Sequence, residues 1–359
     1  MKELQQQSAS SYQLQATRLQ EQLDDGSTRC HLCLWRCKLK HGQRGFCQAH
    51  VNRHGTLYNL SYGILSAIDI GAIEDKPVKH YRPGTRVMSV GSFGCNFRCR
   101  GCHNLEISWG VDALDDLARG QSTAAYVSPQ GLVDAALRHG VEGIAFTYSE
   151  PAVWLEYVID VSALARAHGL YTVHVSNSFV THEALAEMAP WVDVLCSDIK
   201  SLDDAFYKDI CPVARVDQVL GSIAEAQRLG MHVETRTNII PGKNDNPEMM
   251  RAIAEWIRDH LGADSPWHIT RFFPAYQLSD VPMTPSASLW QAHDAAVTAG
   301  LKHVYVYDDK GCDCAQENRP VADYLSGTLD DIHQVKKCAA SCCGDEGVLL
   351  KKYEHEQAQ

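Results

Sequence analysis

Three closely spaced cysteines are the residues that most clearly predict chemistry. Cys95, Cys99 and Cys102 follow one another with the spacing C-x3-C-x2-C. Three thiolates at this spacing can bind one face of a cubane iron–sulfur cluster, and without a fourth local cysteine one iron keeps an open position. An open position distinguishes a catalytic metal site from a structural one. The spacing therefore predicts a catalytic [4Fe-4S] cluster. The alternative is a closed zinc knuckle that recruits a distant fourth ligand, but zinc knuckles usually pair CxxC units and C-x3-C-x2-C fits them poorly.

A second group of cysteines lies near the N-terminus. Cys30, Cys33, Cys37 and Cys47 form the pattern C-x2-C-x3-C-x9-C. Four thiolates complete a structural zinc site, and the same four could hold an iron–sulfur cluster. We expect one structural metal site here, either zinc or an auxiliary cluster. A reduced, metal-free set of cysteines is the alternative.

The remaining cysteines are harder to interpret. Five lie in the last 50 residues of the 359-residue chain: Cys312, Cys314, Cys338, Cys342 and Cys343. They predict an auxiliary metal site, although the adjacent Cys342 and Cys343 cannot easily both bind one metal. A flexible reduced tail is the alternative, because spacing alone fixes neither connectivity nor metal type. Cys196 and Cys211 stand apart from all three groups.

An alternation of apolar runs and helical patterns must position these residues. Strands are expected at 86–91, 143–147, 170–175, 192–200, 231–240, 267–273 and 302–307. Helices are expected at 129–140, 151–169, 181–190, 215–230, 246–262 and 286–300. The strand runs are continuously apolar, which is typical of parallel strands buried on both faces. Repeated units of this kind indicate an α/β fold, with either a parallel barrel or a doubly wound sheet.

Polar residues at the ends of the expected strands favour the barrel. The cysteine loop follows the first strand, residues 147–151 end the second, 176–178 the third and 197–200 the fourth. Barrel active sites are built at the carboxyl ends of the strands. We therefore expect a partial TIM-type (β/α)6 barrel with a Cys-rich N-terminal knuckle and a Cys-rich C-terminal tail.

Several motifs in a fixed order resemble those of a known family. They are CHLCLWRCKLKHGQRGFC, SAIDIGAIEDKPVKHYRPGT, the cysteine loop, TYSEPAVWLEY, SDIKSLDDAFY, ETRTNIIPGKND and HITRFFPAY. Together they resemble the radical S-adenosylmethionine (SAM) superfamily, within it the pyruvate formate-lyase activating enzyme group, and most closely the AmmeMemoRadiSam system radical SAM proteins. The likeness covers roughly residues 30–310.

The resemblance implies roles for individual residues. Cys95, Cys99 and Cys102 would hold the cluster. The residues expected to contact SAM are Asn104, Ser149, Glu150, Asn177, Asp198 and Lys200. TYSEP stands where the superfamily usually has Gly-Gly-Glu-Pro, so this sequence departs from the family pattern there. As alternatives, Asp198 and Lys200 could form a surface ion pair, and Glu150 could be a charge at a helix N-terminus.

The resemblance also implies a reaction. A low-potential donor of the flavodoxin or ferredoxin type would reduce the cluster, SAM would be cleaved to methionine and a 5′-deoxyadenosyl radical, and the radical would take hydrogen from a substrate. A protein substrate, as for a glycyl-radical activase, is the first expectation. A small-molecule substrate is the second, and a non-catalytic iron–sulfur or zinc scaffold is the third.

Composition and segment boundaries complete these expectations. A formal net charge of -11 argues against nucleic acid as the main partner. No apolar run is long enough for a membrane span and no secretory signal opens the chain, so a cytoplasmic location is expected. The expected segments are 1–27, polar; 28–84, the four-cysteine metal-binding knuckle and connector; 85–310, the radical SAM core barrel; and 311–359, the Cys-rich extension.

Overall fold

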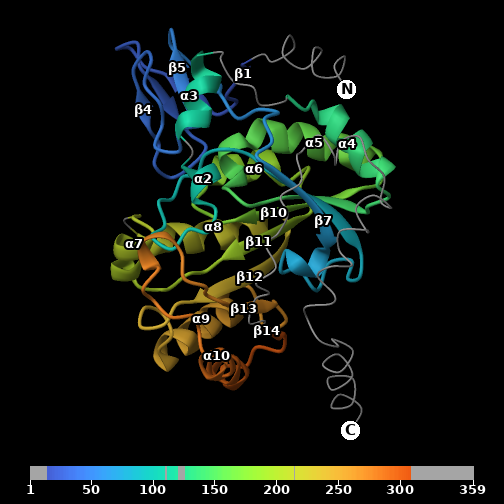
Figure 1. Ribbon diagram of the computed structural model, residues 1–359, viewed down its shortest axis with the longest axis vertical. Coiled ribbons are helices and arrows are strands. Elements are labelled where there is room, and N and C mark those ends of the chain that lie inside the picture. The colour runs from blue at the N-terminus through green and yellow to red at the C-terminus, as the bar shows by residue number, and fades with distance from the viewer. Residues whose placement is uncertain (1–13, 110, 120–125, 214, 309–359) are drawn as a thin grey trace.

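The core of the molecule is one curved sheet of eight strands (Figure 1). A computed structural model describes residues 14–109, 111–119, 126–213 and 215–308. The strands of the sheet, in chain order, are β7 (Ala67–Ala72), β8 (Arg86–Gly91), β9 (Gly143–Phe146), β10 (Tyr171–Ser176), β11 (Val194–Asp198), β12 (His232–Ile239), β13 (Trp267–Arg271) and β14 (Val304–Tyr307). They lie side by side in the order of the chain, from β7 at one edge to β14 at the other.

All neighbouring pairs from β8 to β14 are parallel, as predicted for strands buried on both faces. β9 and β11 are buried along their whole lengths, and each parallel strand lies where the apolar runs predicted it. The exception is β7, an antiparallel edge strand that the sequence did not predict, in which Ala67 lies opposite Gly91. The residues expected to be a connector therefore extend the main sheet.

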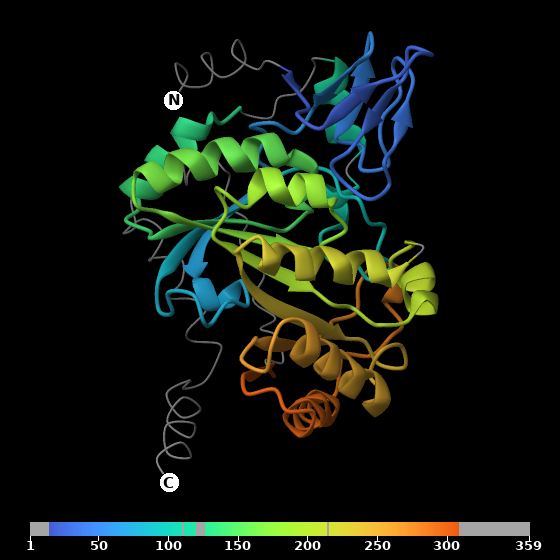
Figure 2. The same ribbon diagram turned by 180° about the vertical axis from the view of Figure 1, so that it is seen from behind.

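The six expected helices are all present between consecutive strands. They are α4 (Pro129–Arg138), α5 (Leu155–Ala167), α6 (His182–Met188), α8 (Val216–Arg228), α9 (Pro247–His260) and α10 (Ser286–Thr298). Figure 2 shows them along one face of the curved sheet, with α10 at the end farthest from the N-terminal strands. Side chains at N-cap positions fix where several of them begin: Asn246 accepts a hydrogen bond from Met249 N at 2.8 Å, and Thr181 accepts one from Ala184 N at 3.1 Å.

Shorter helices that were not predicted lie in the loops of the sheet. They are α2 (Leu105–Ser108) and α3 (Val111–Arg119) after the cysteine loop, α7 (Asp204–Ile210) after β11, and the 3-10 turns η1 (Ile73–Asp75), η2 (Pro151–Trp154) and η3 (Tyr276–Leu278). None of the helices in the described part of the chain is long and apolar enough to cross a membrane.

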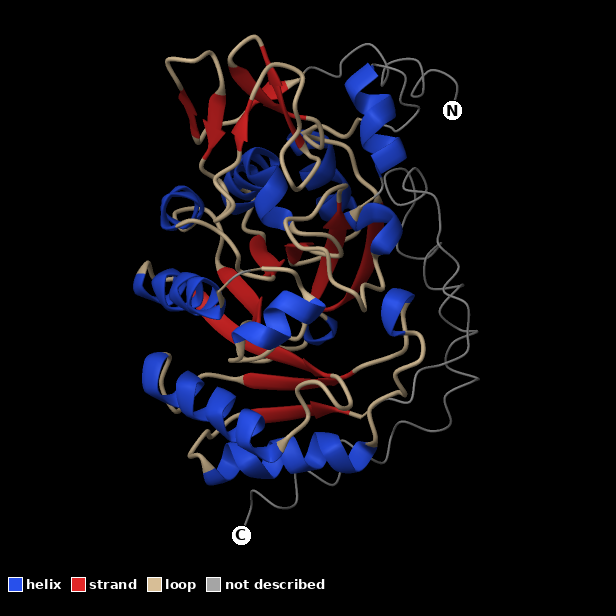
Figure 3. Cartoon of the chain, turned by 90° about the vertical axis from the view of Figure 1, so that its left-hand side faces the viewer, coloured by secondary structure: helices blue, strands red, loops and turns tan. Residues whose placement is uncertain are grey.

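Two small antiparallel sheets form a knuckle on top of the main sheet (Figure 3). One contains β1 (Gln15–Ala16), β5 (His50–Arg53) and β6 (Thr56–Asn59), and the other β2 (Gln20–Gln22), β3 (Thr28–Cys30) and β4 (Lys38–Leu39). Residues 14–27, expected to belong to a separate polar segment, thus contribute two strands to this knuckle. Its buried side chains, among them Leu32, Leu39 and Leu57, belong to the same hydrophobic core as the main sheet.

Candidate active site

A cavity of about 490 Å³ opens at the carboxyl ends of the parallel strands. Its lining includes the three central cysteines and all six residues expected to contact SAM: Cys95, Cys99, Cys102, Asn104, Ser149, Glu150, Asn177, Asp198 and Lys200. These residues come from the ends of β9, β10 and β11 and from the loop after β8. A volume of this size is typical of small-molecule and cofactor sites. The structure therefore brings together residues that lie up to 105 positions apart in the chain.

The three cysteines gather on one loop between β8 and α2. Their thiols are close enough for the charges of Cys99 and Cys102 to affect Cys95. Phe97 N donates to Cys95 Sγ at 3.4 Å, and Cys102 Sγ donates to Ser108 Oγ at 3.8 Å. Burial raises the pKa of the Cys95 thiol. Bound iron would stabilise the thiolate that burial disfavours.

A glycine and several aromatic groups shape the cysteine loop. Gly94 has a φ of +100°, and a Cβ placed there would lie 2.8 Å from the carbonyl oxygen of Cys47. Only glycine satisfies both this backbone conformation and this close approach. Phe97 is buried against Phe179 and Tyr207, with ring centroids 5.6 Å and 6.4 Å away. The loop is therefore fixed by its contact with the Cys47 carbonyl at Gly94 and by the aromatic packing around Phe97.

The described residues contain no group of three or more His, Cys, Asp or Glu side chains arranged to hold a single metal ion. A cubane places each thiolate on a different iron, so its ligands surround a larger volume than those of one ion. The three thiols, the adjoining cavity and two buried polar atoms without a partner, Ser149 Oγ and Asn238 Oδ1, fit a cluster with a polar cofactor beside it.

Glu150 is a buried carboxyl at the centre of the polar lining. It accepts hydrogen bonds from Ser176 Oγ and Asn177 N, both at 2.8 Å, and from Ala152 N at 3.0 Å. The last of these bonds caps η2, so the expected alternative of a helix N-terminal charge also describes Glu150. Burial nevertheless raises its pKa to about 7. A carboxyl that is this deeply buried beside a cavity is suited to pair with a cationic ligand group.

Asp198 and Lys200 form an ion pair, but not one on the open surface. Lys200 Nζ lies 2.6 Å from Asp198 Oδ2, and Arg236 Nε lies 2.6 Å from Asp198 Oδ1. Burial alone would raise the pKa of Asp198, but the guanidinium and the ammonium hold it well below its usual range. Asp198 is 9% exposed and all three side chains line the cavity. Arg236 was not predicted from the sequence; it lies on β12 directly opposite Asp198 on β11.

Two asparagines connect the strand ends to the cysteine loop. Asn104 Nδ2 donates to the carbonyl oxygen of Tyr148 at 2.6 Å. Asn177 Nδ2 donates to Asn96 Oδ1 at 2.8 Å and lies 3.9 Å from Cys95 Sγ. Tyr148 itself has a φ of +69°, which is uncommon for a residue other than glycine. The departure from the family pattern at TYSEP thus lies on an unusual backbone turn at the rim of the cavity.

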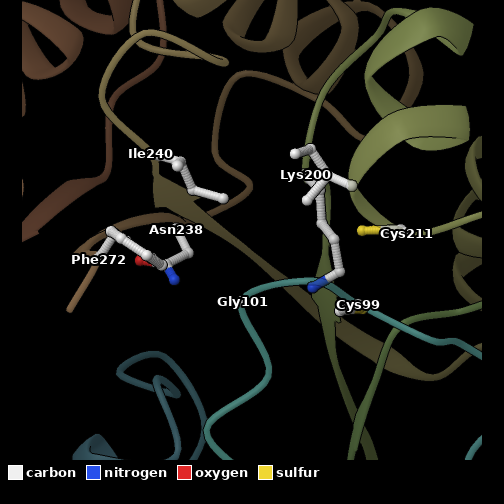
Figure 4. Close-up of a pocket in the computed structure, with 8 residues that line it drawn as sticks. Cys99, Gly101, Lys200, Cys211, Asn238, Ile240 and Phe272 are labelled. Atoms are coloured by element: carbon white, nitrogen blue, oxygen red, sulfur yellow. The ribbon is translucent and has the colours of Figure 1, made fainter. Parts of the chain in front are cut away.

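Cys211 is a further thiol at this site and belongs to none of the three cysteine groups in the sequence. It follows α7 and lines a smaller cavity of about 60 Å³ together with Cys99 and Lys200 (Figure 4). A hydrogen bond from Cys211 lowers the pKa of Cys99, whereas burial raises that of Cys211. No spacing rule could have found it, because 112 positions separate it from Cys99.

The two outer cysteine groups have different outcomes. Cys30, Cys33 and Cys47 are buried in the knuckle and Cys37 is half-buried beside them. Cys30 N donates to the carbonyl oxygen of Cys37 at 2.9 Å, and a Cβ placed at Gly45 would lie 3.9 Å from Cys37 Sγ and 3.6 Å from Cys47 Sγ. The five C-terminal cysteines, Cys312, Cys314, Cys338, Cys342 and Cys343, lie outside the described residues.

Comparisons with known proteins agree with this geometry. The family model described as the radical SAM superfamily matches residues 89–257. An uncharacterized protein of Methanocaldococcus jannaschii is 39% identical over 286 residues, which cover 80% of this chain and 83% of that protein. The pyruvate formate-lyase-activating enzyme of Clostridium pasteurianum is 26% identical over 179 residues, 49% of this chain and 71% of that enzyme.

Two further similarities are more distant. The (2S)-3-sulfopropanediol dehydratase activating enzyme of Klebsiella oxytoca is 25% identical over 120 residues, 33% of this chain and 38% of that enzyme. Among solved structures, a radical SAM methyltransferase from Sphaerobacter thermophilus has a TM-score of 0.49 at 12% identity, covering 87% of this chain and 82% of that chain.

Proposed function

This chain belongs to the radical SAM superfamily, and we propose that it is an enzyme that cleaves SAM reductively to generate a 5′-deoxyadenosyl radical. One observation carries the proposal: the cavity at the carboxyl ends of the strands is lined by three cysteines with an open-site spacing and by six polar residues suited to hold SAM. A partial barrel of the (β/α)6 type, formed by the curved sheet and its helices, is part of the proposal.

Each group of residues has a distinct part in binding. Cys95, Cys99 and Cys102 would hold the [4Fe-4S] cluster, which when bound would supply the electron for reductive cleavage of SAM. The Glu150 carboxylate pairs with the SAM amino group, with Ser149 beside it. Asp198 and Lys200 orient the remainder of SAM, and Arg236 fixes Asp198 in place. Asn104 and Asn177 hold the strand ends against the cysteine loop.

The chain also protects the reactive site from solvent. Asp198, Glu150 and Ser149 are each at most 9% exposed, and Phe97 is buried within the cysteine loop. Removing water strengthens the charge interactions inside the cavity and limits side reactions of a radical. The contribution of the protein would be to hold the cofactor and the substrate in position for hydrogen transfer.

The substrate class proposed first is a protein, as for a glycyl-radical activase of the pyruvate formate-lyase type. Partial similarity to several activating enzymes supports it. A low-potential donor of the flavodoxin or ferredoxin type would supply the electron, and the location would be the cytoplasm. A small-molecule substrate is the second candidate, favoured by the cavity volume of about 490 Å³, and a non-catalytic scaffold is the third.

The outer cysteines complete the proposal. We place a structural or auxiliary metal site, with zinc or an iron–sulfur cluster, at Cys30, Cys33, Cys37 and Cys47, and a further auxiliary site among the five C-terminal cysteines. Three cysteines of the first group are buried and Cys37 is half-buried beside them, which supports this part of the proposal.

SAM cleavage by the anaerobically reconstituted full chain tests the proposed function. With dithionite and SAM, the wild-type protein should release 5′-deoxyadenosine, and the variant with Cys95, Cys99 and Cys102 all changed to Ala should release none. Cys196→Ala is the matched control, because that buried cysteine donates to the Pro77 carbonyl and does not line the cavity. A wild-type protein that releases no 5′-deoxyadenosine, or a triple variant that still does, would contradict the proposal.

Isotope transfer distinguishes the substrate classes. Deuterium that moves into 5′-deoxyadenosine from a labelled protein partner selects the activase. Transfer from labelled metabolites alone selects the small-molecule enzyme.

A further inference from the structure

The knuckle has a charge opposite to that of the whole chain. Residues 15–59 contain seven Arg or Lys and three acidic residues, Glu21, Asp24 and Asp25, a formal charge of +4, whereas the chain has a formal net charge of -11. All three acidic residues precede residue 28, and residues 28–54 contain no Asp or Glu. The basic residues of this segment are Arg29, Arg36, Lys38, Lys40, Arg44 and Arg53. His31, His41, His50 and His54 also lie in it. A positive region on an acidic protein steers a negatively charged partner toward it.

Part of this positive charge is free to meet a partner. Arg36 pairs with Glu183 at 2.7 Å, and Arg44 pairs with Asp115 at 2.8 Å, so these two join the knuckle to the rest of the molecule. The side chain of Lys38 is 50% exposed and pairs with Asp25. Lys40 is exposed next to it, and no acidic side chain within the described residues forms an ion pair with it.

The same segment brings its four cysteines close together in the knuckle. Cys30 N donates to the carbonyl oxygen of Cys37 at 2.9 Å, and Cys30, Cys33 and Cys47 are buried, with Cys37 half-buried. Gly45 lies between two of them, because a Cβ placed there would be 3.6 Å from Cys47 Sγ and 3.9 Å from Cys37 Sγ. Four cysteine thiolates are the complete ligand set of a closed iron–sulfur cluster, which transfers electrons without binding substrate.

The four-thiol group lies directly against the loop that carries the central cysteines. Gly94, next to Cys95, approaches the carbonyl oxygen of Cys47 so closely that an added Cβ would lie 2.8 Å from it. On the same side, Trp35 Nε1 donates to the carbonyl oxygen of Asn96 at 2.8 Å. The loops of the two cysteine groups are therefore in direct contact.

Arg98 lies between the two groups. It donates through Nη2 to the carbonyl oxygen of Phe46 at 2.6 Å and through Nη1 to that of Cys95 at 3.3 Å. These two bonds place one partly buried cation beside Phe46, which precedes Cys47, and beside Cys95. A cation near both cysteine groups makes it less costly to place negative charge on either of them.

From these contacts we propose that the knuckle is the electron-entry module of the enzyme. Cys30, Cys33, Cys37 and Cys47 hold a redox-active iron–sulfur cluster, and the basic face at Lys38 and Lys40 docks an acidic, low-potential electron-transfer protein of the flavodoxin or ferredoxin class. This inference rests on the proposed function and adds the route of the electron to it.

The proposed step is a one-electron transfer in which no bond forms or breaks. The docked carrier is oxidised by one electron, which passes through the knuckle cluster to the cluster at Cys95, Cys99 and Cys102. The knuckle group returns to its oxidised state when the electron leaves it. The carrier is the only reductant that the step requires.

Metal analysis tests the knuckle cluster without any assay of activity. The full chain is prepared with the three central and five C-terminal cysteines changed to Ala and is reconstituted anaerobically with iron and sulfide. It should retain iron and sulfide in equal amounts, about two or about four of each per chain, and give an EPR signal after reduction. Adding Cys33→Ala and Cys47→Ala should remove both. Zinc in place of iron, or no bound metal, would overturn the proposal.

Charge variants test the docking face. SAM cleavage is driven either by reduced flavodoxin or by dithionite, in the wild type and in a variant with Lys38→Gln and Lys40→Glu. The variant should need about tenfold more flavodoxin for half-maximal rate, since it loses electrostatic steering, while its dithionite-driven rate is unchanged. The control is Lys302→Glu, an exposed lysine near β14 at the opposite end of the sheet (Figure 1).

The outcomes separate this inference from the proposed function. If flavodoxin drives the charge variant as well as it drives the wild type, the docking face is wrong, even though SAM cleavage continues. If dithionite fails to drive SAM cleavage in the wild type, the proposed function itself is wrong. Cys33→Ala with Cys47→Ala in an otherwise wild-type chain should lose flavodoxin-driven but not dithionite-driven cleavage, and equal rates with flavodoxin would contradict the relay.

Discussion

Single buried groups dominate the electrostatics of the candidate site. Glu150 accepts three hydrogen bonds, yet burial still raises its pKa to about 7. His174, which lies 3.9 Å from it, is fully buried, and burial lowers the pKa of this imidazole to about 3, so it stays neutral. Among the described residues, Glu150 therefore forms no ion pair with a charged side chain. A ligand ammonium group would supply the missing partner.

The pH dependence of stability should reveal this buried carboxyl. The pKa of Glu150 rises on folding from 4.5 to about 7, so its favourable contribution is present below pH 4.5 and is lost as the pH rises to 7. The loss should be ~3 kcal/mol in the ligand-free protein. Urea unfolding at several pH values should show this fall in the wild type and not in Glu150→Gln. Glu248→Gln, an exposed change on α9, is the control and should behave as the wild type does; a pH profile for Glu150→Gln identical to that of the wild type would refute the assignment.

Cys211 shows what spacing cannot reveal at the residue scale. Its thiol donates to Cys99 although the two are distant in sequence. Hydrogen bonds to cluster sulfurs raise the reduction potential. We expect Cys211→Ala to make the potential of the central cluster more negative, as measured by spectroelectrochemistry, with Cys196→Ala leaving it unchanged. A potential that does not move in Cys211→Ala would show that this thiol does not influence the cluster.

At the scale of elements, the sequence predicted most of what positions the site. Apolar runs identified the seven parallel strands, because hydrophobic periodicity is a local signal. The resemblance to the radical SAM superfamily, together with polar residues at the strand ends, identified the six lining residues. Arg236 was missed because neighbouring strands place it beside Asp198. β7 was missed because it carries Asp69 and Gly71 and pairs only at the sheet edge. These features depend on tertiary contacts that no local pattern encodes.

The close contact between the knuckle and the cysteine loop depends on one glycine. Gly94→Ala would strain a backbone with φ of +100° and push a Cβ against the Cys47 carbonyl. The free energy of unfolding should fall by ~3 kcal/mol. Gly169→Ala is the matched control, since Gly169 has φ of +77° with nothing within 4 Å, and it should cost only ~1 kcal/mol. Equal losses in urea unfolding would mean that the contact with the knuckle contributes nothing.

A polar network closes the end of the sheet opposite the cavity. Glu234, on β12, is fully buried and accepts from the backbone N–H groups of Lys79 and His80 at 2.9 Å and 2.8 Å. His232 and His268 contact its two oxygens at 2.9 Å and 2.7 Å. Burial alone would raise the pKa of Glu234, but these hydrogen bonds hold it well below its usual range. The carboxylate thus joins the loop before β8 to the N-terminal ends of β12 and β13.

Removing the negative charge of Glu234 should make the loop at residues 77–81 less stable. Glu234→Gln replaces one acceptor oxygen with a donor, and we expect a loss of ~3 kcal/mol in the free energy of unfolding. Hydrogen exchange should become faster at residues 77–81. Because the pKa of Glu234 is lowered on folding, its contribution is present above the usual carboxyl range and is lost as the pH falls, so the two proteins should converge in acid. The control is Glu187→Gln, on the exposed side of α6, which should show neither effect. If hydrogen exchange at residues 77–81 is unchanged in Glu234→Gln, Glu234 does not hold this loop in place.

At the scale of the whole molecule, three cysteine groups are associated with one sheet. The central group opens on the cavity, the knuckle group lies against its loop, and the third group lies outside the described residues. The spacing of the central cysteines predicted the site before any geometry was known. The sequence did not reveal that the knuckle contacts this site, because this requires the fold to bring Cys47 to Gly94.

The most direct test of the central claim is EPR spectroscopy of the reduced central cluster with and without SAM. The protein carries Cys33→Ala, Cys47→Ala and Ala at the five C-terminal cysteines, so only Cys95, Cys99 and Cys102 can hold a cluster. We predict a signal that changes shape when SAM is added, because SAM binds the open iron, and no signal after a further Cys99→Ala change. A signal that is identical with and without SAM would contradict the claim that these three cysteines leave one iron open to this cofactor.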